Sequence, residues 1–480
     1  MSKKIDKDSV SSIYRIIGSE IVQVTILQIV VTGITMLIGL IFARYYDLKD
    51  YGKLVYFMSL FGGMRMIAAL GLTSQVLIDI SQSYSRNLPL ESKFYGLLSV
   101  RLATCAAFMA MMLLLSAMLN DSLVVFAALV AAIALCGDFG IAALRGAGHL
   151  RAAMAMQSLQ PLLYACGALI AVLAKLPVQI VFMVLLISFV ISLLVTIWLL
   201  AQTIRWPQPG MFRLDNPRES LQSAGGMYLL GITGTVFTTC ATLALGWRAR
   251  FSDAALIAVP LYLVMMPSTL IGAAIPAAYF PKLVGLHARN DKAGLARLVA
   301  GFISATAFFS LPVVFVLVAF PNTVLGLLYG PRYGAAALLL TLAAPVALLS
   351  TLVAVATATL AAIGRIRDAV HSSAIASIIV LCVVAADLIV QVDLAWIAGA
   401  HSIAALASLL WQLYLLGPPA WTAIRSTATC ALVASIMTGV LRLLLSDTTS
   451  SLMFIIPILG FGMAVYALWV WYAIVQKQNL

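Results

Sequence analysis

The sequence predicts an all-α polytopic membrane protein of about 14 transmembrane helices, arranged as two lobes of about six helices each and a C-terminal helix pair. Of the 480 residues, 63% are hydrophobic and only 10% are charged, and the mean hydropathy is +1.07. A soluble chain carries about 25% charged residues. Apolar runs of about 20 residues, the length that a helix needs to cross the bilayer, recur along the whole chain.

Taken in order, the apolar runs predict the individual spans. We expect them at residues 20–43, 53–79, 94–118, 122–143, 154–175, 178–203, 221–246, 255–279, 298–320, 335–362, 369–391, 395–416, 426–444 and 452–475. With the N-terminus inside, most of the 29 Lys and Arg residues fall in cytoplasmic segments, as the positive-inside rule requires. Both termini are therefore expected in the cytoplasm. The net charge of +12 has the same origin, so no nucleic-acid partner is expected.

Two short segments indicate an internal repeat. "LRGAGHLRAA" at 144–153 and "LAAIGRIRDA" at 360–369 both read L-x-x-x-G-x-x-R-x-A, 216 residues and six spans apart. Because six is even, the two halves run in the same direction across the membrane, as in two-lobed transporters built from parallel repeats. The predicted parts are a cytoplasmic tail (1–18), an N-lobe with helices 1–6 (19–203), a cytoplasmic linker (204–220), a C-lobe with helices 7–12 (221–416), and helices 13 and 14 with a cytoplasmic C-terminus (417–480).

Signatures of enzymes and metal sites are absent from the sequence. The six cysteines lie in apolar spans without a CxxC pair, and the four histidines are scattered. There is no GxxxxGK[ST] phosphate loop and no HExxH zinc motif. The longest loops between spans are short and face the cytoplasm. The sequence therefore predicts no cofactor, no metal site and no enzymatic activity.

A deep arginine is the first candidate for ligand binding. Arg65 lies near the middle of the second span, where an unpaired guanidinium costs about 2.5–3.5 kcal/mol. Small residues share its helix face and leave room beside it. Two interpretations remain: an internal ion pair with Asp138 or Asp387, or a host for a phosphate group, whose oxygens match the guanidinium fork.

Three further arginines carry the same kind of ambiguity. Arg101, in the third span, either snorkels toward the inner surface or joins Arg65 in binding an anion. Arg248 and Arg250 lie in a short outer loop against the positive-inside trend. They are either solvated loop charges or a second basic station on the exit side.

Polar stripes and buried carboxylates complete the candidates. Gln28, Thr32 and Thr35 share one face of the first helix, and Thr235 and Thr238 share one face of the seventh. These stripes either line the interface between the lobes or pack helices together, as hydroxyls often do in membranes. Asp138 and Asp387 are the acidic residues deepest in spans, and each is a proton or sodium carrier, a neutral acid or an ion-pair partner.

Two segments resemble a known family. "ARYYDLKDYGKLVYFMSLFGGMRMIAALGL" at 43–72 and "LGLLYGPRYGAAALLL" at 325–340 are similar to segments of bacterial polysaccharide and O-antigen flippases, the lipid-linked oligosaccharide translocases of the multidrug, oligosaccharidyl-lipid and polysaccharide exporter superfamily. The paired Gly-containing loops and the span count extend the resemblance over nearly the whole chain. Two departures concern the cavity more than the fold: "YYDLKD" replaces a Gly-Pro-like turn, and Asp79 stands where relatives often have a basic residue.

The resemblance implies a two-lobed bundle in the bacterial inner membrane that opens alternately to each side. Its substrate would be an undecaprenyl-diphosphate-linked oligosaccharide, namely an O-antigen, capsule or exopolysaccharide repeat unit. Arg65 and Arg101 would hold the diphosphate, and the threonines of the two stripes would face the sugar. Polysaccharide polymerase and chain-length machinery would be further partners. The rivals are an ion-coupled multidrug exporter of the same superfamily and a membrane glycosyltransferase or ligase of the envelope pathway.

Overall fold

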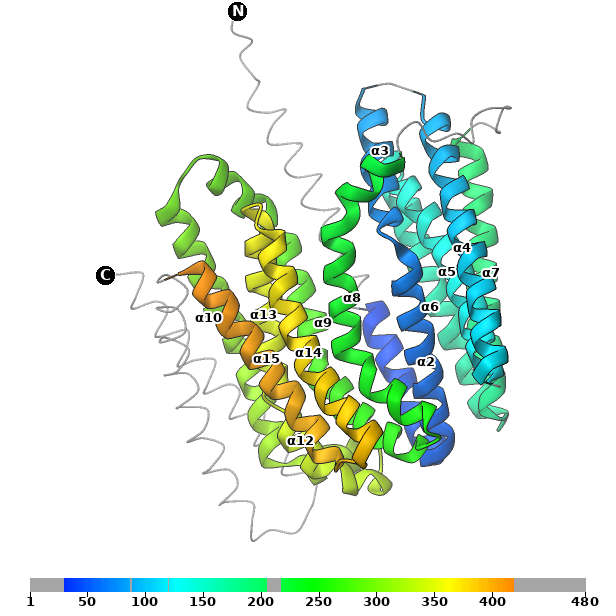
Figure 1. The fold of residues 1–480 in the computed structure, drawn as a ribbon, viewed down its shortest axis with the longest axis vertical. Coiled ribbons are helices and arrows are strands. Elements are labelled where there is room, and N and C mark those ends of the chain that lie inside the picture. Colours follow the sequence, from blue (N-terminus) through cyan, green and yellow to red (C-terminus); the bar gives the residue numbers. More distant parts are fainter. Residues whose placement is uncertain (1–29, 87–88, 120, 205–216, 418–480) are drawn as a thin grey trace, which may run out of the picture. The chain divides into compact units, whose positions relative to one another are not determined.

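The structure, a computed structural model, describes residues 30–86, 89–119, 121–204 and 217–417 (Figure 1). Contacts divide the chain into two compact units, Met1–Tyr228 and Leu229–Leu480. No β-strand occurs in the described ranges, which confirms the all-α membrane architecture. The predicted spans 426–444 and 452–475, the tail 1–18 and most of the linker 204–220 lie outside those ranges, so the count of 14 and the lobe boundaries stay predictions.

The first unit is built around one central helix. Its helices are Val30–Tyr45, α2 (Leu48–Ala69), α3 (Leu72–Ser85), α4 (Glu91–Leu119), α5 (Ser122–Gly146), α6 (Leu150–Leu173) and α7 (Val178–Thr203). Helix α5 packs against α2, α3, α4, α6 and α7. It is rich in Ala and Gly, and such small residues let membrane helices approach closely. Side chains carried by α5 are therefore held firmly relative to those neighbours.

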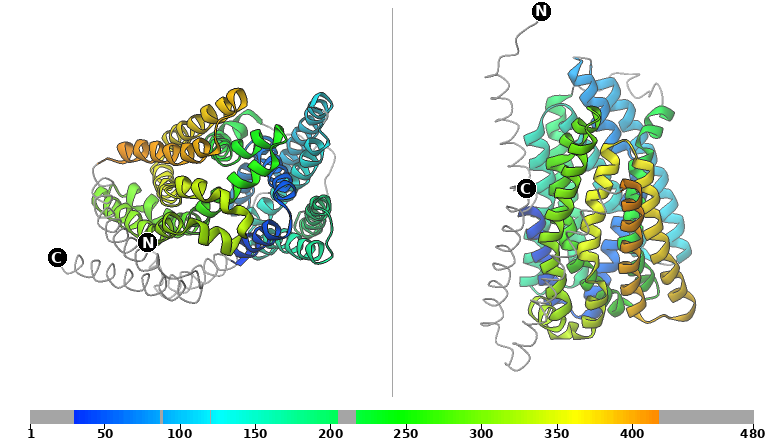
Figure 2. Two further views of the ribbon diagram at one scale, coloured as in Figure 1. Left: turned by 90° about the horizontal axis from the view of Figure 1, so that it is seen from below. Right: turned by 90° about the vertical axis from the view of Figure 1, so that its left-hand side faces the viewer.

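The second unit begins within α8 (Pro217–Trp247) and continues through α9 (Phe251–Ala288) and α10 (Lys292–Ala319). Short α11 (Pro321–Leu328), η1 (Pro331–Ala336) and α12 (Ala337–Ala343) follow, then α13 (Val346–Ala362), α14 (Ile366–Val390) and α15 (Leu394–Leu416). Helix α13 packs on α9, α10 and α15, and α14 runs beside α15 (Figure 2). The predicted outer loop before the tenth span thus contains helical turns.

The eleven spans expected between residues 53 and 416 are present, two of them bent, whereas of the span expected at 20–43 the structure describes only the shorter apolar helix Val30–Tyr45. Nine helices are long and apolar enough to cross a membrane, and two bent pairs extend the number to 11 within the described residues. The first pair is α2 and α3, at 48°, and the second joins η1–α12 to α13, at 45°. The first bend arises where Leu70 and Gly71 both adopt left-handed backbone, with φ of 49° and 69°. For Leu70 that backbone costs about 1–2 kcal/mol, which neighbouring contacts must offset.

The repeat proposed from the two loops reappears in their geometry. Gly148 and Gly364 are both left-handed, and in each loop the next residue donates its N–H to the carbonyl four residues before that glycine, Leu144 or Leu360. This is the Schellman arrangement that ends a helix on a glycine. Helices α6 and α14 begin at residues 150 and 366, and α7 and α15 at 178 and 394, so both pairs keep the spacing of 216 residues. The repeat therefore extends over three helices of each half.

Candidate functional site

Arg65 does not stand alone in the first unit. Its Nε lies 2.9 Å and its Nη2 2.6 Å from Oδ2 of Asp138 on α5. Both side chains remain reachable, being 38% and 28% exposed, and the guanidinium lies 5.9 Å from the ring centre of Phe61. A side chain added at Gly62, one turn away on α2, would meet nothing within 4 Å. Arg65 thus has an internal counter-ion and, at the same time, open space beside it.

Arg101 has a different environment. It is fully buried, and its Nη1 and Nη2 donate to the carbonyl oxygens of Ala68 and Ala69 at 3.0 and 3.1 Å, with Thr73 Oγ1 at 3.3 Å. These carbonyls end α2 at the bend and have no partner within their own helix. The snorkelling interpretation is therefore wrong, because the guanidinium turns inward to satisfy a broken helix. In this conformation the side chain offers no surface to a ligand.

A third arginine, Arg145, lies near the end of α5, in the segment 144–153. Arg145 follows Asp138 by seven residues, two turns along one face of α5, and its guanidinium donates to Gln157 Oε1. Its buried Nε has no hydrogen-bond partner. Asp138 interacts electrostatically with both Arg101 and Arg145 in addition to its ion pair with Arg65. The spacing of seven, which places Asp138 and Arg145 on one face of α5, was the signal that could have revealed Arg145.

The polar stripes are only partly engaged in packing. Thr35 is exposed and donates to the carbonyl of Val31 at 2.9 Å, and Thr32 is partly buried, while Gln28 lies outside the described residues. On α8, Thr238 is exposed and donates to carbonyls of its own helix, and Thr235 is half-buried. The oxygens of these hydroxyls still have lone pairs that can accept hydrogen bonds.

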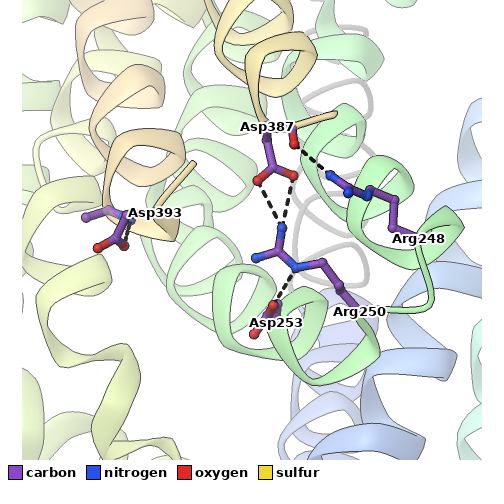
Figure 3. A network of polar contacts seen from close by, with 6 residues as sticks. Arg248, Arg250, Asp253, Asp387 and Asp393 are labelled. Atoms are coloured by element: carbon purple, nitrogen blue, oxygen red, sulfur yellow. Dashed lines mark hydrogen bonds and ion pairs between the residues drawn. The ribbon is translucent and has the colours of Figure 1, made fainter. Parts of the chain in front are cut away.

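Arg248 and Arg250 both bind the end of α14 (Figure 3). Arg250 Nη1 contacts Oδ1 and Oδ2 of Asp387 at 2.9 and 3.2 Å, and its Nε contacts Asp253 Oδ2 at 2.7 Å. Arg248 Nη1 donates to the backbone carbonyl of Asp387 at 2.7 Å. Asp393, also drawn, stands apart and caps the start of α15 through the N–H of Ala395. The loop between α8 and α9 is thus fastened to α14.

This network decides between the alternative states of Asp387 and of the two arginines. Of the possible states of Asp387, the structure shows the ion pair, with its side chain 1% exposed. Burial alone would lower the pKa of the Arg250 guanidinium, but the hydrogen bonds with Asp253 and Asp387 outweigh that effect and raise the pKa. In this conformation the Arg250 guanidinium is engaged by Asp253 and Asp387, so it cannot bind a phosphate in the bidentate manner.

We expect Arg250→Gln to destabilise the protein more than Asp387→Asn. The first change leaves a buried carboxylate without its cation and costs about 3–5 kcal/mol. The second removes the buried charge as well and leaves Arg250, 25% exposed, with Asp253 and water. Thermal unfolding of the purified variants in one detergent measures the difference, and equal losses would contradict the assignment of Asp387 as the buried member of the pair.

No group of three or more His, Cys, Asp or Glu side chains that could hold a metal ion occurs in the described part of the chain.

The chain is similar to known proteins in both sequence and fold. The family described as "Polysaccharide biosynthesis protein" matches residues 41–338. No curated protein sequence matches the chain. Among solved structures, the lipid II flippase MurJ in an inward closed conformation is similar with a TM-score of 0.73 at 13% identity, covering 94% of this chain and 100% of that one.

Two transporters of the MOP superfamily show the same architecture. A multidrug resistance MATE family transporter in an inward-facing conformation is similar with a TM-score of 0.62 at 16% identity, covering 82% of this chain and 98% of that one. A transporter from Pyrococcus furiosus follows with a TM-score of 0.55 at 15% identity, covering 83% and 96%. At these identities the likeness concerns the fold, and it confirms the architecture that the sequence resemblance implied.

Proposed function

The chain belongs to the polysaccharide biosynthesis protein family, and we propose that it is a flippase that carries an undecaprenyl-diphosphate-linked oligosaccharide across the bacterial inner membrane by alternating access. The observation that supports this proposal is the partly exposed Arg65–Asp138 pair, with open space beside it at Gly62. A diphosphate is the part of such a lipid that most resists crossing hydrocarbon, because an isolated charge at the bilayer centre is costly. A fixed cation at the middle of a span lowers that cost.

Asp138 is, in this proposal, the counter-ion that Arg65 holds while no substrate is bound. The Arg65 guanidinium contacts a single carboxylate oxygen, Oδ2 of Asp138, whereas a diphosphate offers it several oxygens. Because charge-assisted hydrogen bonds to phosphate are strong, the diphosphate can replace the carboxylate. The displaced carboxylate shares one face of α5 with Arg145, two turns further along the helix. Exchange of one anion for another leaves Arg65 paired at every stage, which avoids exposing a bare guanidinium to lipid.

The other parts of the substrate have matching surroundings. The exposed hydroxyls of Thr35 and Thr238, with Thr32 and Thr235 beside them, offer hydrogen-bonding groups to a sugar. The polyprenyl tail is apolar and can stay in the bilayer. Arg101 contributes indirectly, by holding the bend next to Arg65, and Arg248, Arg250 and Asp387 contribute by fastening one end of α8.

The charge at mid-membrane favours this function over a multidrug exporter of the same fold. A carrier of cationic drugs needs unpaired acidic side chains, whereas Asp138 and Asp387 are both paired with arginine. An enzyme of the envelope pathway would need a cluster of catalytic groups in an extramembrane segment, and the proposal assigns the chain no catalytic step.

The proposal is tested with the full chain reconstituted in liposomes. A fluorescent undecaprenyl-diphosphate-linked oligosaccharide is placed in both leaflets, and a membrane-impermeant reductant bleaches the outer leaflet. We expect bleaching to pass from about half of the probe in empty liposomes toward all of it in the presence of the protein. The same lipid without its diphosphate sugar and a cationic dye serve as controls. Export of the dye with no movement of the lipid would favour the multidrug exporter instead.

A further inference from the structure

A histidine is buried in the second unit in contact with backbone groups of two helices. His401, on α15, is 0% exposed. Its Nδ1 lies 2.8 Å from the carbonyl oxygen of Ile397 on the same helix, and its Nε2 lies 3.0 Å from the carbonyl oxygen of Phe237 on α8. The Phe237 ring packs against the imidazole with ring centres 5.2 Å apart. The imidazole therefore bridges the two helices.

The two contacts impose a condition on the protonation state. A carbonyl oxygen is only an acceptor, so each ring nitrogen must carry a proton to bond it, and neutral imidazole carries one proton. In the neutral form, the nitrogen that carries the proton forms a hydrogen bond. The lone pair of the other nitrogen then faces the lone pairs of a carbonyl oxygen at 3.0 Å or less, which is repulsive. Only imidazolium satisfies both contacts.

The titratable side chains of the helices around His401 do not supply an alternative partner. Within the described residues, none of them forms a hydrogen bond or ion pair with the imidazole. Helices α12 and α13 carry no titratable side chain, and Asp253 and Asp387 bind Arg250. The remaining candidates in the outer halves of the packed helices are Cys240 on α8, Tyr262 on α9 and Cys382 on α14.

The repeat shows that packing alone does not call for a histidine here. At the spacing of 216 residues, the N-terminal equivalent of His401 is Leu185, a buried leucine on α7. The same position thus fills a helix interface with a plain hydrocarbon side chain in the first half. The histidine adds a proton-dependent link that the leucine cannot make.

We propose that His401 is a proton-binding site that latches α8 onto α15. With the proton bound, the imidazolium joins the carbonyl groups of Ile397 and Phe237. When the proton leaves, the contact with Phe237 becomes repulsive, because the Nδ1 proton is retained by the carbonyl one turn back on the same helix. Helix α8 is then free to shift relative to α14 and α15, and we call this contact the α8 seam. Its other hydrogen bonds do not titrate: Ser377 Oγ donates to the Thr233 carbonyl, and Thr233 Oγ1 donates to Ser373 Oγ.

The test follows the proton and the helix separately in the full chain in lipid nanodiscs. The three other histidines, His149, His287 and His371, are exposed and are replaced by Gln, so that the ¹⁵N spectrum of labelled imidazole reports His401 alone. In a second preparation, all six native cysteines are removed. Spin labels are then placed at the exposed positions Leu229 on α8 and Tyr414 on α15, and their separation is measured from pH 5 to pH 9.

At low pH we expect both ring nitrogens of His401 to be protonated and the two spin labels to show a single short distance. The population with that short distance should be lost over the pH range in which one ring nitrogen deprotonates. His401→Gln should make the distance independent of pH, whereas Ser377→Ala, on the same seam, should keep the pH dependence. A neutral imidazole at every pH, an imidazolium that persists to pH 9 with an unchanged distance, or a pH-dependent distance in His401→Gln would each overturn the proposal. None of these readouts involves transport, so a failure here leaves the flippase proposal standing.

Discussion

Cells that depend on this chain for surface polysaccharide are expected to lose it when Arg65 is replaced by alanine. In the proposed function the partly exposed guanidinium receives the diphosphate, and its removal takes away the fixed positive charge that lowers the cost of carrying that group. Arg65→Lys should retain part of the activity, because an ammonium keeps the charge but lacks the planar fork that bonds two phosphate oxygens. The measurement is complementation of a flippase-deficient strain at matched protein level.

The ion pair with Asp138 makes a second variant necessary. If Arg65 served only to neutralise Asp138, removing both charges together would restore a functional protein. If Arg65 holds the substrate anion, Arg65→Gln combined with Asp138→Asn should remain inactive. Asp138→Asn alone frees the guanidinium and should keep activity. Restored polysaccharide in the double variant would refute the role of Arg65 in binding the substrate anion. It would show that Arg65 serves only to neutralise Asp138.

Stability separates this effect from unfolding. Both partners of the pair are partly exposed, so losing the pair is expected to cost less than losing the fully buried contacts of Arg101. The Arg65→Ala protein should therefore melt close to the parent in detergent. Arg86, an exposed arginine after the end of α3, provides the matched control: Arg86→Ala removes the same side chain and should change neither melting nor polysaccharide.

Replacing Arg101 is expected to have the opposite signature, a large loss of stability. Arg101→Met keeps much of the buried volume but leaves the carbonyl groups of Ala68 and Ala69 without donors. Each buried orphan costs about 1–3 kcal/mol, so we expect the free energy of unfolding to fall by about 2–4 kcal/mol. Leu70, held in left-handed backbone directly after these carbonyls, loses part of what maintains it. Thermal unfolding and the yield of monodisperse protein measure the effect.

Two further changes make the test of Arg101 specific. Arg101→Lys should recover little of the lost stability, because one ammonium at the end of a flexible stem cannot serve two carbonyls as the planar guanidinium does. Thr73→Val removes only the longest of the three contacts, at 3.3 Å, and should cost little. Parent-like melting of Arg101→Met would show that the bend does not need the guanidinium.

Features that are decided within a single helix or loop could be predicted from the sequence. Hydrophobic length located the spans between residues 53 and 416, because crossing a bilayer sets a length that hydropathy records directly. The glycine loops at 144–153 and 360–369 were recognised as equivalents, because a left-handed turn leaves a glycine at a fixed place. The bend after Ala69 was missed, because Leu70 gives no local sign of left-handed backbone.

Side-chain contacts between different helices could not be predicted from the sequence. Asp138 was one of two possible partners for Arg65, and only the packing of α2 on α5 selects it. Arg101 turning to the end of α2, and Arg250 turning to Asp387, depend on helix positions that no spacing within one segment records. Local patterns thus identified most of the charged residues, whereas the contacts that give them their roles came from the structure.

The contact of Arg101 with the end of α2 has an electrical consequence for its neighbour. The carbonyl end of a helix carries a partial negative charge of about half an electron, and in α2 that end lies one turn beyond Arg65. Left bare, it would oppose an approaching anion at the place where Arg65 has to receive one. The Arg101 guanidinium cancels it from behind, within the protein, and so keeps the local potential positive. The bend and the anion site are therefore served by one buried charge, and a variant that repaired the bend with a neutral donor would still weaken the attraction for the anion.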